Sequence, residues 1–154
     1  MNNDSYRLGV GVMLLNKDKK VFVGKRKDIK KDSWQMPQGG IQKGEKEEDA
    51  ALRELFEETG VKKVKIIFKS KKWFKYDLPS SIKKGLWKGK YLGQKQKWYL
   101  MEFLGNEKKD INLNIKNPEF CDWKWVPINN LEKIIISFKK KMYKEIVKEF
   151  SKKI

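Results

Sequence analysis

Short apolar stretches separated by polar turns divide this chain into strands and helices. Residues 8–15 form an apolar run that predicts a buried strand, and residues 20–26 are predicted to be its hairpin partner. Residues 32–41, with Pro37 and a glycine pair, and the basic stretch 78–93 are predicted loops. Four more stretches have the pattern of strands, at residues 64–69, 73–76, 97–104 and 120–126.

Helical patterns occupy the middle and the end of the chain. Residues 45–59 are rich in glutamate, alanine and leucine, and Gly60 follows them, which predicts a helix that stops at this glycine. Residues 137–150 are predicted to form a basic amphipathic helix, after a short helical turn at residues 129–133. Because strands and helices alternate irregularly, we expect a mixed α/β fold, as a single domain over residues 1–154.

The side chains that are missing narrow the possible chemistry. The chain has no histidine and a single cysteine, Cys121, which excludes Ser-His-Asp catalysis, histidine-bound zinc and an internal disulfide. We expect Cys121 to be a small buried or half-buried residue. Acid–base chemistry is left to carboxylates, lysines or tyrosines, and a metal would bind mainly oxygen, which favours Mg²⁺, Mn²⁺ or Ca²⁺.

The chain is strongly basic, with 37 lysines and arginines, 20 acidic residues and a net charge of +17. Such a balance is typical of proteins that bind RNA or DNA. All but three of the basic residues are lysines, so a broad compositional bias explains the charge equally well. Without a long apolar run or a signal-peptide pattern, we expect a cytoplasmic protein that does not enter membranes, and nothing indicates an obligate protein partner.

One face of the predicted central helix is acidic. At about 100° per residue, Glu54, Glu57 and Glu58 fall within one narrow arc, while Leu52 and Leu55 fall on another. A solvated acidic face is the ordinary interpretation. However, like charges four residues apart destabilise a helix, and no lysine follows these glutamates at that spacing within it. A divalent cation would turn this repulsion into coordination.

The spacing around this helix resembles the Nudix box. That box is a glycine, five residues, glutamate, seven residues, Arg-Glu, an aliphatic residue, any residue, Glu-Glu, any residue, glycine and an aliphatic residue. All nine specified positions are filled in this chain. They are Gly39, Glu45, Arg53, Glu54, Leu55, Glu57, Glu58, Gly60 and Val61.

The resemblance implies the Nudix fold, a mixed sheet between helices with the box as a loop-helix-loop. It implies that Glu54, Glu57 and Glu58 bind Mg²⁺ or Mn²⁺ together with the backbone carbonyl of Gly39, and that Arg53 orients the glutamates. The metal would neutralise a pyrophosphate group and lower the pKa of a bound water. Supporting roles fall to Gly40, Glu45 and Gly60.

Motifs outside the box resemble the bacterial RNA pyrophosphohydrolase group, which also includes dinucleoside polyphosphate hydrolases. This implies removal of pyrophosphate from the triphosphorylated 5′ end of RNA, which leaves a monophosphate and promotes mRNA decay. By position, Glu119 would be a further metal ligand or base, although on its own it is an ordinary surface acid. The motifs lie at residues 6–7, 34–40, 93–98, 118–120, 123–126 and 137–139.

The same resemblance implies a binding surface for the substrate. Tyr76 and Phe138 would offer faces to a base, and cations would face phosphates or the first nucleotides, a combination that suits an unpaired RNA end. Taken singly, each lysine is more typical of a solvated surface, and Trp123 and Trp125 of core packing. The cations are Arg7, Arg26, Lys97 and Lys139.

Other functions stay open at this stage. A hydrolase of diadenosine polyphosphates such as Ap4A would use the same box, and hydrolysis of nucleotide sugars or ADP-ribose is a more distant alternative. A non-catalytic RNA-binding module on a Nudix scaffold is a third, although intact glutamates argue against it. The stretches 25–32 and 80–90 depart from the pattern of the group, so the base preference is not predicted.

Overall fold

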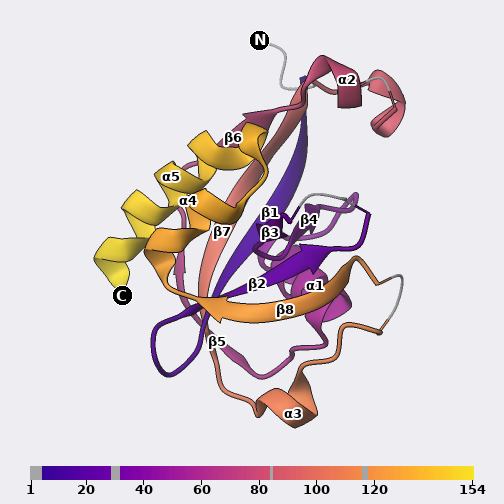
Figure 1. The fold of residues 1–154 in the computed structure, drawn as a ribbon. Helices are drawn as coiled ribbons and strands as arrows, with labels where there is room; N and C mark the ends of the chain where they lie inside the picture. Colours follow the sequence, from indigo (N-terminus) through magenta and orange to yellow (C-terminus); the bar gives the residue numbers. More distant parts are fainter. Residues whose placement is uncertain (1–4, 29–31, 84, 116–117) are drawn as a thin grey trace.

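A mixed β-sheet lies at the centre of the computed structural model, which describes residues 5–28, 32–83, 85–115 and 118–154 (Figure 1). The strand order is β3-β2-β1-β7-β5, with β4 beside β1, β6 beside β7 and β8 beside β2. The strands are β1 (Tyr6–Leu15), β2 (Val21–Arg26), β3 (Trp34–Gln35), β4 (Gln38–Gly40), β5 (Val64–Lys69), β6 (Phe74–Asp77), β7 (Gly93–Phe103) and β8 (Phe120–Val126).

Strands β1 and β7 form a parallel pair in the middle of the sheet. Its register runs from Tyr6↔Gly93 to Leu15↔Glu102. Alternate residues of β1 enter different cores: Val12 packs in the cluster with α1, whereas Met13 packs in the cluster with α5. Burial on both faces explains why β1 reads as a continuous apolar run and not as an alternating pattern.

The helices flank this sheet on both faces, as Figure 1 shows. The α-helices are α1 (Glu47–Thr59), α2 (Ser80–Lys83), α3 (Glu107–Asp110), α4 (Leu131–Ile134) and α5 (Lys140–Phe150). Short 3₁₀ turns lie at η2 (Trp87–Gly89), η3 (Ile128–Asn130), η4 (Ser137–Lys139) and η5 (Ser151–Lys153). The predicted mixed α/β architecture is therefore confirmed.

Helix α1 ends where the sequence predicts. Gly60 adopts a left-handed conformation, with φ of 77°, and its N–H donates to the carbonyl of Phe56. A residue with a Cβ is strained at this φ, so glycine is the natural terminator. The helix starts at Glu47, two residues later than predicted, because Glu45 belongs to the preceding loop.

Several boundaries differ from the predictions. The hairpin of β1 and β2 is paired only at Leu15↔Val21, because β4 occupies the edge of β1 and β2 pairs with β8. The predicted loop at 32–41 contains β3 and β4, and the loop at 78–93 contains α2 and η2. Strand β7 begins four residues before the predicted start at residue 97, and α3 was not predicted.

Two further predictions concern residues of β8, namely the burial of Cys121 and the packing of two tryptophans. Cys121 is exposed, contrary to the prediction, because Phe120 takes the inward position in the alternation of this strand. Trp123 stacks on Phe22 at a centroid distance of 5.6 Å and, with Trp125, packs against the core, as predicted. Of the stretch 25–32, residues 29–31 lie outside the described part, as do residues 1–4 at the N-terminus.

Over the described residues, the structure has no helix with the length and apolar character needed to cross a lipid bilayer.

Candidate active site

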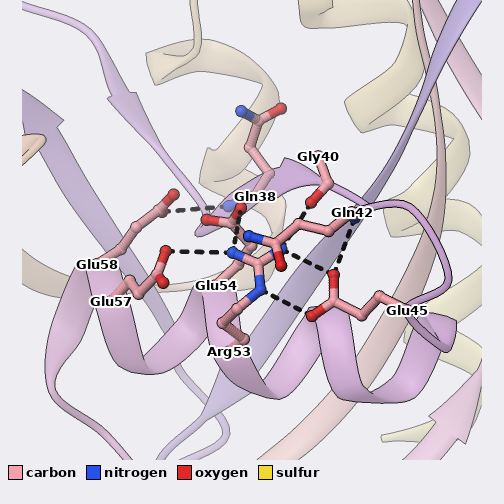
Figure 2. Close-up of polar contacts among 8 residues, drawn as sticks. All are labelled: Gln38, Gly40, Gln42, Glu45, Arg53, Glu54, Glu57 and Glu58. Atoms are coloured by element: carbon pink, nitrogen blue, oxygen red, sulfur yellow. Dashed lines mark hydrogen bonds and ion pairs between the residues drawn. The ribbon is translucent and has the colours of Figure 1, made fainter.

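Three glutamates of α1 face the loop that leads into the helix (Figure 2). Glu54 and Glu58 lie one helical turn apart, and Glu57 lies beside them on the more open side. The side chain of Glu57 is 35% exposed, that of Glu54 is 14% exposed, and Glu58 as a residue is only 3% exposed. The predicted acidic arc is thus largely removed from solvent, and a simple solvated face does not describe it.

Arg53 holds one side of this cluster through a fork of hydrogen bonds. Its Nε donates to Glu45 Oε2 at 2.8 Å and its Nη2 donates to Glu45 Oε1 at 3.0 Å. Nη2 also donates to the carbonyl of Gly40 at 2.8 Å, while Nη1 reaches Glu54 and Glu57, each at 3.2 Å. The guanidinium hydrogen bond holds the pKa of Glu45 below its usual range. Arg53 therefore fixes both the loop and the carboxylates, the positioning role that the resemblance implies.

The other side of the cluster is left electrostatically unsatisfied. Burial raises the pKa of Glu58 well above its usual range, and the charges of Glu119 and Glu54 raise it further. Glu58 Oε1 accepts the backbone N–H of Gln38 at 3.2 Å, but its Oε2 is buried with no hydrogen-bond partner among the described residues. Burial also raises the pKa of Glu54 to about 7. Glu54 thus shares the Arg53 cation with Glu45 and Glu57, and Glu58 has no cation partner among the described residues.

The residues present fit a divalent ion at this place. A Cβ at Gly39 would lie 2.0 Å from Cδ of Glu54, so only glycine lets that carboxylate rest against the backbone there. Oxygen-only donors suit Mg²⁺ or Mn²⁺. Among the described residues, no group of three or more acidic or thiol side chains is already arranged to hold a metal ion. A bound ion would thus draw together Glu54 and Glu57, which share Arg53, and Glu58, which has no cation partner among the described residues.

Opposite the acidic helix lies a wall of cations and aromatic rings. This basic wall shares one cavity of about 600 Å³, which we call the reaction cavity, with the acidic face of α1, which we call the acidic wall. Of the three α1 glutamates, Glu54 alone is among the described residues that line the cavity. The rings of Tyr76 and Phe138 lie 5.8 Å apart at 48°. Glu119, which is exposed, lies on the acidic side and raises the pKa of Glu58. The cations that line the cavity are Arg7, Arg26 and Lys139.

Lys139 is the least expected member of this wall. It is only 4% exposed, and burial together with the charge of Arg26 lowers its pKa to about 8. Its Nζ lies 3.4 Å from Gln35 Oε1 and 5.0 Å from the centroid of the Tyr76 ring. A buried ammonium with one long hydrogen bond is poorly compensated, just as the buried Glu58 is.

Comparison with known proteins identifies the scaffold. Residues 5–146 match the NUDIX domain family. The chain is 54% identical, over 145 residues, to proteins named RNA pyrophosphohydrolase from Rickettsia canadensis and Rickettsia prowazekii, covering 94% of this chain and 89% of each relative. The chain belongs to the Nudix family. The predicted Nudix fold and hydrolase class are confirmed.

Solved Nudix structures share the fold at low sequence identity. The Escherichia coli dihydroneopterin triphosphate pyrophosphohydrolase superposes with a TM-score of 0.72 at 18% identity, over 94% of this chain and 98% of that one. A Caenorhabditis elegans Ap4A hydrolase complex gives 0.63 at 16% identity, with the same coverages. These likenesses concern the fold alone. Nudix hydrolases generally use divalent metal ions, and membership of the family implies the same for this chain.

In this Nudix scaffold the structure brings together all but one of the residues predicted to contact substrate. Lys97 lies elsewhere: its Nζ donates to the carbonyl of Lys71 at 2.7 Å and sits 5.3 Å from the Trp73 ring. It projects from β7 in alternation with Gln94 and Gln96, so its side chain leaves the sheet on the other face. The sequence motif around Lys97 is therefore adjacent to the site, while the lysine itself is not in the cavity.

Sequence reasoning missed an amide network beside the Nudix box. Gln96 Nε2 donates to Gln38 Oε1 at 2.6 Å and to Gln94 Oε1, and Trp98 Nε1 donates to Gln96 Oε1 at 2.9 Å. Gln38 and Gln94 line the reaction cavity. The alternation Gln94-Lys-Gln96-Lys-Trp98 indicates this arrangement, because every second residue of a strand faces the same side. Asp28, which pairs with Arg26, and Trp87 were also missed.

Proposed function

We propose that this chain hydrolyses the triphosphorylated 5′ end of RNA, releasing pyrophosphate and leaving a 5′-monophosphate. The observation that carries the proposal is the opposition of two walls in one cavity. Glu54 and Glu119 line the cavity together with Arg7, Arg26 and Lys139, and the rings of Tyr76 and Phe138 line it as well. The relatives named RNA pyrophosphohydrolase cover nearly the whole chain and support the same substrate.

Each wall has a distinct task in this proposal. Glu54, Glu57, Glu58 and the Gly39 carbonyl would hold Mg²⁺ or Mn²⁺, which supplies charge neutralisation and an acidified water when bound. Arg7, Arg26 and Lys139 would bind the remaining phosphate oxygens. Since the chain has no histidine, the proton of the attacking water passes to a carboxylate of the acidic group, which includes Glu119.

The aromatic pair would select a nucleotide end over inorganic polyphosphate. Tyr76 and Phe138 offer ring surface at the cavity, and Arg26, held by Asp28, offers a planar guanidinium nearby. Base stacking on such surfaces is worth about 1–3 kcal/mol per base and tolerates any sequence.

We further propose that residues 1–154 form one cytoplasmic domain that needs no obligate protein partner.

The test compares substrates and metals in one assay. Purified protein is incubated with Mg²⁺ or Mn²⁺ and either a short 5′-triphosphorylated RNA or Ap4A, and kcat/KM is measured from the released products. We expect metal-dependent release of pyrophosphate from RNA, lost in Glu57→Gln. A clear preference for Ap4A would move the substrate to dinucleoside polyphosphates. Inactivity of the parent protein on both substrates would favour a binding module.

A further inference from the structure

A second hollow of about 780 Å³ lies next to the reaction cavity, on the opposite face of the sheet. At the start of β1 and β7 the sheet extends beyond α1 toward α2, as Figure 1 shows. The face that α1 covers further along the strands is open here, and Leu8 is 43% exposed on it. We call this hollow the basic trough and define it by Tyr6, Lys43, Trp73, Lys90, Tyr91 and Lys95.

The strand register explains why these residues gather there. Leu8 pairs with Lys95 across β1 and β7, and Lys95 pairs with Lys75 of β6, so their side chains share one face. Gln94 and Gln96 alternate with Lys95 and point to the other face, toward the reaction cavity. One short stretch of β7 thus serves both hollows, one with amides and the other with a lysine.

The chemistry of the trough is that of a surface for single-stranded nucleic acid. In a chain with 37 basic residues, lysines alone say little. Here they alternate with rings: Lys95 lies 5.7 Å from the centroid of Trp73, and Lys90 lies 5.4 Å from that of Tyr91. Over the described part of the chain, no carboxylate lines the trough, although Asp77 accepts the Tyr6 hydroxyl at its margin. Cations beside half-exposed rings bind a backbone and stacked bases.

Arg7 connects the trough to the reaction cavity. It lines both hollows, and its guanidinium lies 5.1 Å from the centroid of the Trp87 ring, which belongs to the wall of the reaction cavity. The backbone beside it is equally continuous, since Gly40 of the Nudix box pairs with Gly9 and Ile41 N–H donates to the carbonyl of Leu8. A chain that enters the reaction cavity can therefore pass over Arg7 into the trough.

We propose that the basic trough binds the RNA chain downstream of the nucleotides held in the reaction cavity. This inference rests on the proposed function, because it requires a substrate longer than a nucleotide. RNA binding in the trough would make the enzyme prefer longer substrates. A dinucleotide occupies only the reaction cavity, whereas a longer unpaired RNA also contacts the trough through its phosphates and bases. The gain is electrostatic and is therefore weakened by salt.

The experiment uses the full chain with the double variant Lys43→Glu and Lys95→Glu. The control, Lys17→Glu with Lys108→Glu, makes the same charge change at the far end of the sheet, where both lysines line another hollow. Two substrates are compared, a triphosphorylated dinucleotide and an unstructured 12-nucleotide RNA with the same 5′ end. A second variant, Trp73→Leu, removes the ring without changing charge.

We expect kcat/KM on the 12-nucleotide RNA to fall about tenfold in the trough variant at low salt, with a salt slope shallower by about 1.4, from two lost contacts. On the dinucleotide the trough variant should stay within about twofold of the parent, as should the control on both substrates. Trp73→Leu should lower activity on the long RNA only. Equal losses on both substrates, or an unchanged rate on the long one, would overturn the proposal.

Binding of a 5′-hydroxyl 12-nucleotide RNA, followed by fluorescence anisotropy, separates this inference from the proposed function. That ligand has no triphosphate, so its affinity reports on the trough whether or not the protein hydrolyses RNA. We expect weaker binding in the trough variant and unchanged binding in the control. If the trough variant and the control weaken binding equally, the loss reflects net charge alone, and the proposal that the trough binds RNA is wrong.

Discussion

The acidic wall on α1 and the basic wall of the reaction cavity both contain buried charged groups, and these groups have opposite signs. On the acidic wall, burial raises the pKa of Glu54 to about 7 and that of Glu58 well above its usual range. On the basic wall, burial lowers the pKa of Lys139 to about 8. Each wall pays the cost of removing charge from water. A metal-bound polyphosphate carries both charges that the walls lack, so one ligand relieves both.

The walls differ in how firmly they are built. The acidic wall stands on a helix and is fixed by the fork of Arg53, with four carboxylate or carbonyl partners around one guanidinium. The basic wall is assembled from β1, β2 and η4, segments far apart in the sequence. In the proposed function, metal binding would thus depend on one local motif, whereas substrate binding would depend on tertiary structure.

The largest expected effect comes from breaking the acidic wall. Glu58→Gln removes a buried carboxylate whose second oxygen has no partner in the described part of the chain. We expect kcat to fall by at least about a hundredfold, as for loss of one electrostatic group at a reaction centre. In metal-free buffer the variant should melt at a higher temperature than the parent, because an uncompensated charge is gone.

The matched control is Glu48→Gln, on the exposed side of the same helix. It should change neither rate nor melting temperature appreciably. Full activity in Glu58→Gln would remove Glu58 from the site.

Arg53→Lys tests the fork that organises the acidic wall. Lysine keeps the charge but cannot contact Glu45 in two places while also reaching Gly40, Glu54 and Glu57. We expect a loss of about 10–100-fold in metal affinity or activity, the usual range for a residue that orients metal ligands. Titration of Mn²⁺ followed by calorimetry gives the affinity directly. An affinity equal to that of the parent would mean that charge suffices.

Lys139→Met tests the basic wall and separates function from stability. Removing the ammonium should lower kcat/KM about tenfold, the value of a hydrogen bond to a charged group. It should also raise the free energy of unfolding at pH 7, by at most about 3 kcal/mol from a pKa lowered from 10.5 to about 8. Lys140→Met, at the exposed neighbouring position, is the control and should do neither.

The lowered pKa of Lys139 also determines how the free energy of unfolding changes with pH. The unfolded chain keeps the Lys139 proton up to about pH 10.5, whereas the fold releases it near pH 8. The cost of burying the ammonium is therefore complete below pH 8 and disappears as the pH rises toward 10.5. Denaturant titrations at pH 7 and pH 9.5 should show that the advantage of Lys139→Met shrinks at the higher pH. A constant advantage would contradict the shifted pKa.

The smallest effect is expected at Lys97, which the sequence places beside substrate and the structure places outside the reaction cavity. Its ammonium is bound to the Lys71 carbonyl. On a triphosphorylated dinucleotide, Lys97→Ala should change kcat/KM by less than about twofold, as for most exposed substitutions. A tenfold loss would show that Lys97 contacts the 5′ end.

The parts of the site that the sequence predicted are those built from local spacing. The box places Glu54, Glu57 and Glu58 on one helix face, and Gly60 ends that helix in a left-handed turn. These features depend on residues within a few turns of each other, so periodicity and motif suffice. The same holds for the long apolar strand β1, whose pattern is unambiguous.

What the sequence could not predict arises from long-range packing. Burial of Lys139 depends on contacts with Tyr76 and Gln35, far away in the chain. The amide network depends on the register of β1 and β7, and the weak hairpin of β1 and β2 on competition from β4 and β8. Such pairings are set by the whole sheet, and no local pattern of the chain specifies them.

The central claim is that one ligand neutralises both walls, so metal and triphosphate must bind cooperatively. The direct measurement is calorimetric titration of Mg²⁺ into the protein, with and without a dinucleotide bearing a methylene-bridged 5′-triphosphate, corrected for metal bound by the free analogue. The account predicts that each ligand tightens the other at least about tenfold, and reciprocally, and that Glu58→Gln abolishes this coupling. Equal Mg²⁺ affinity with and without the analogue would contradict it.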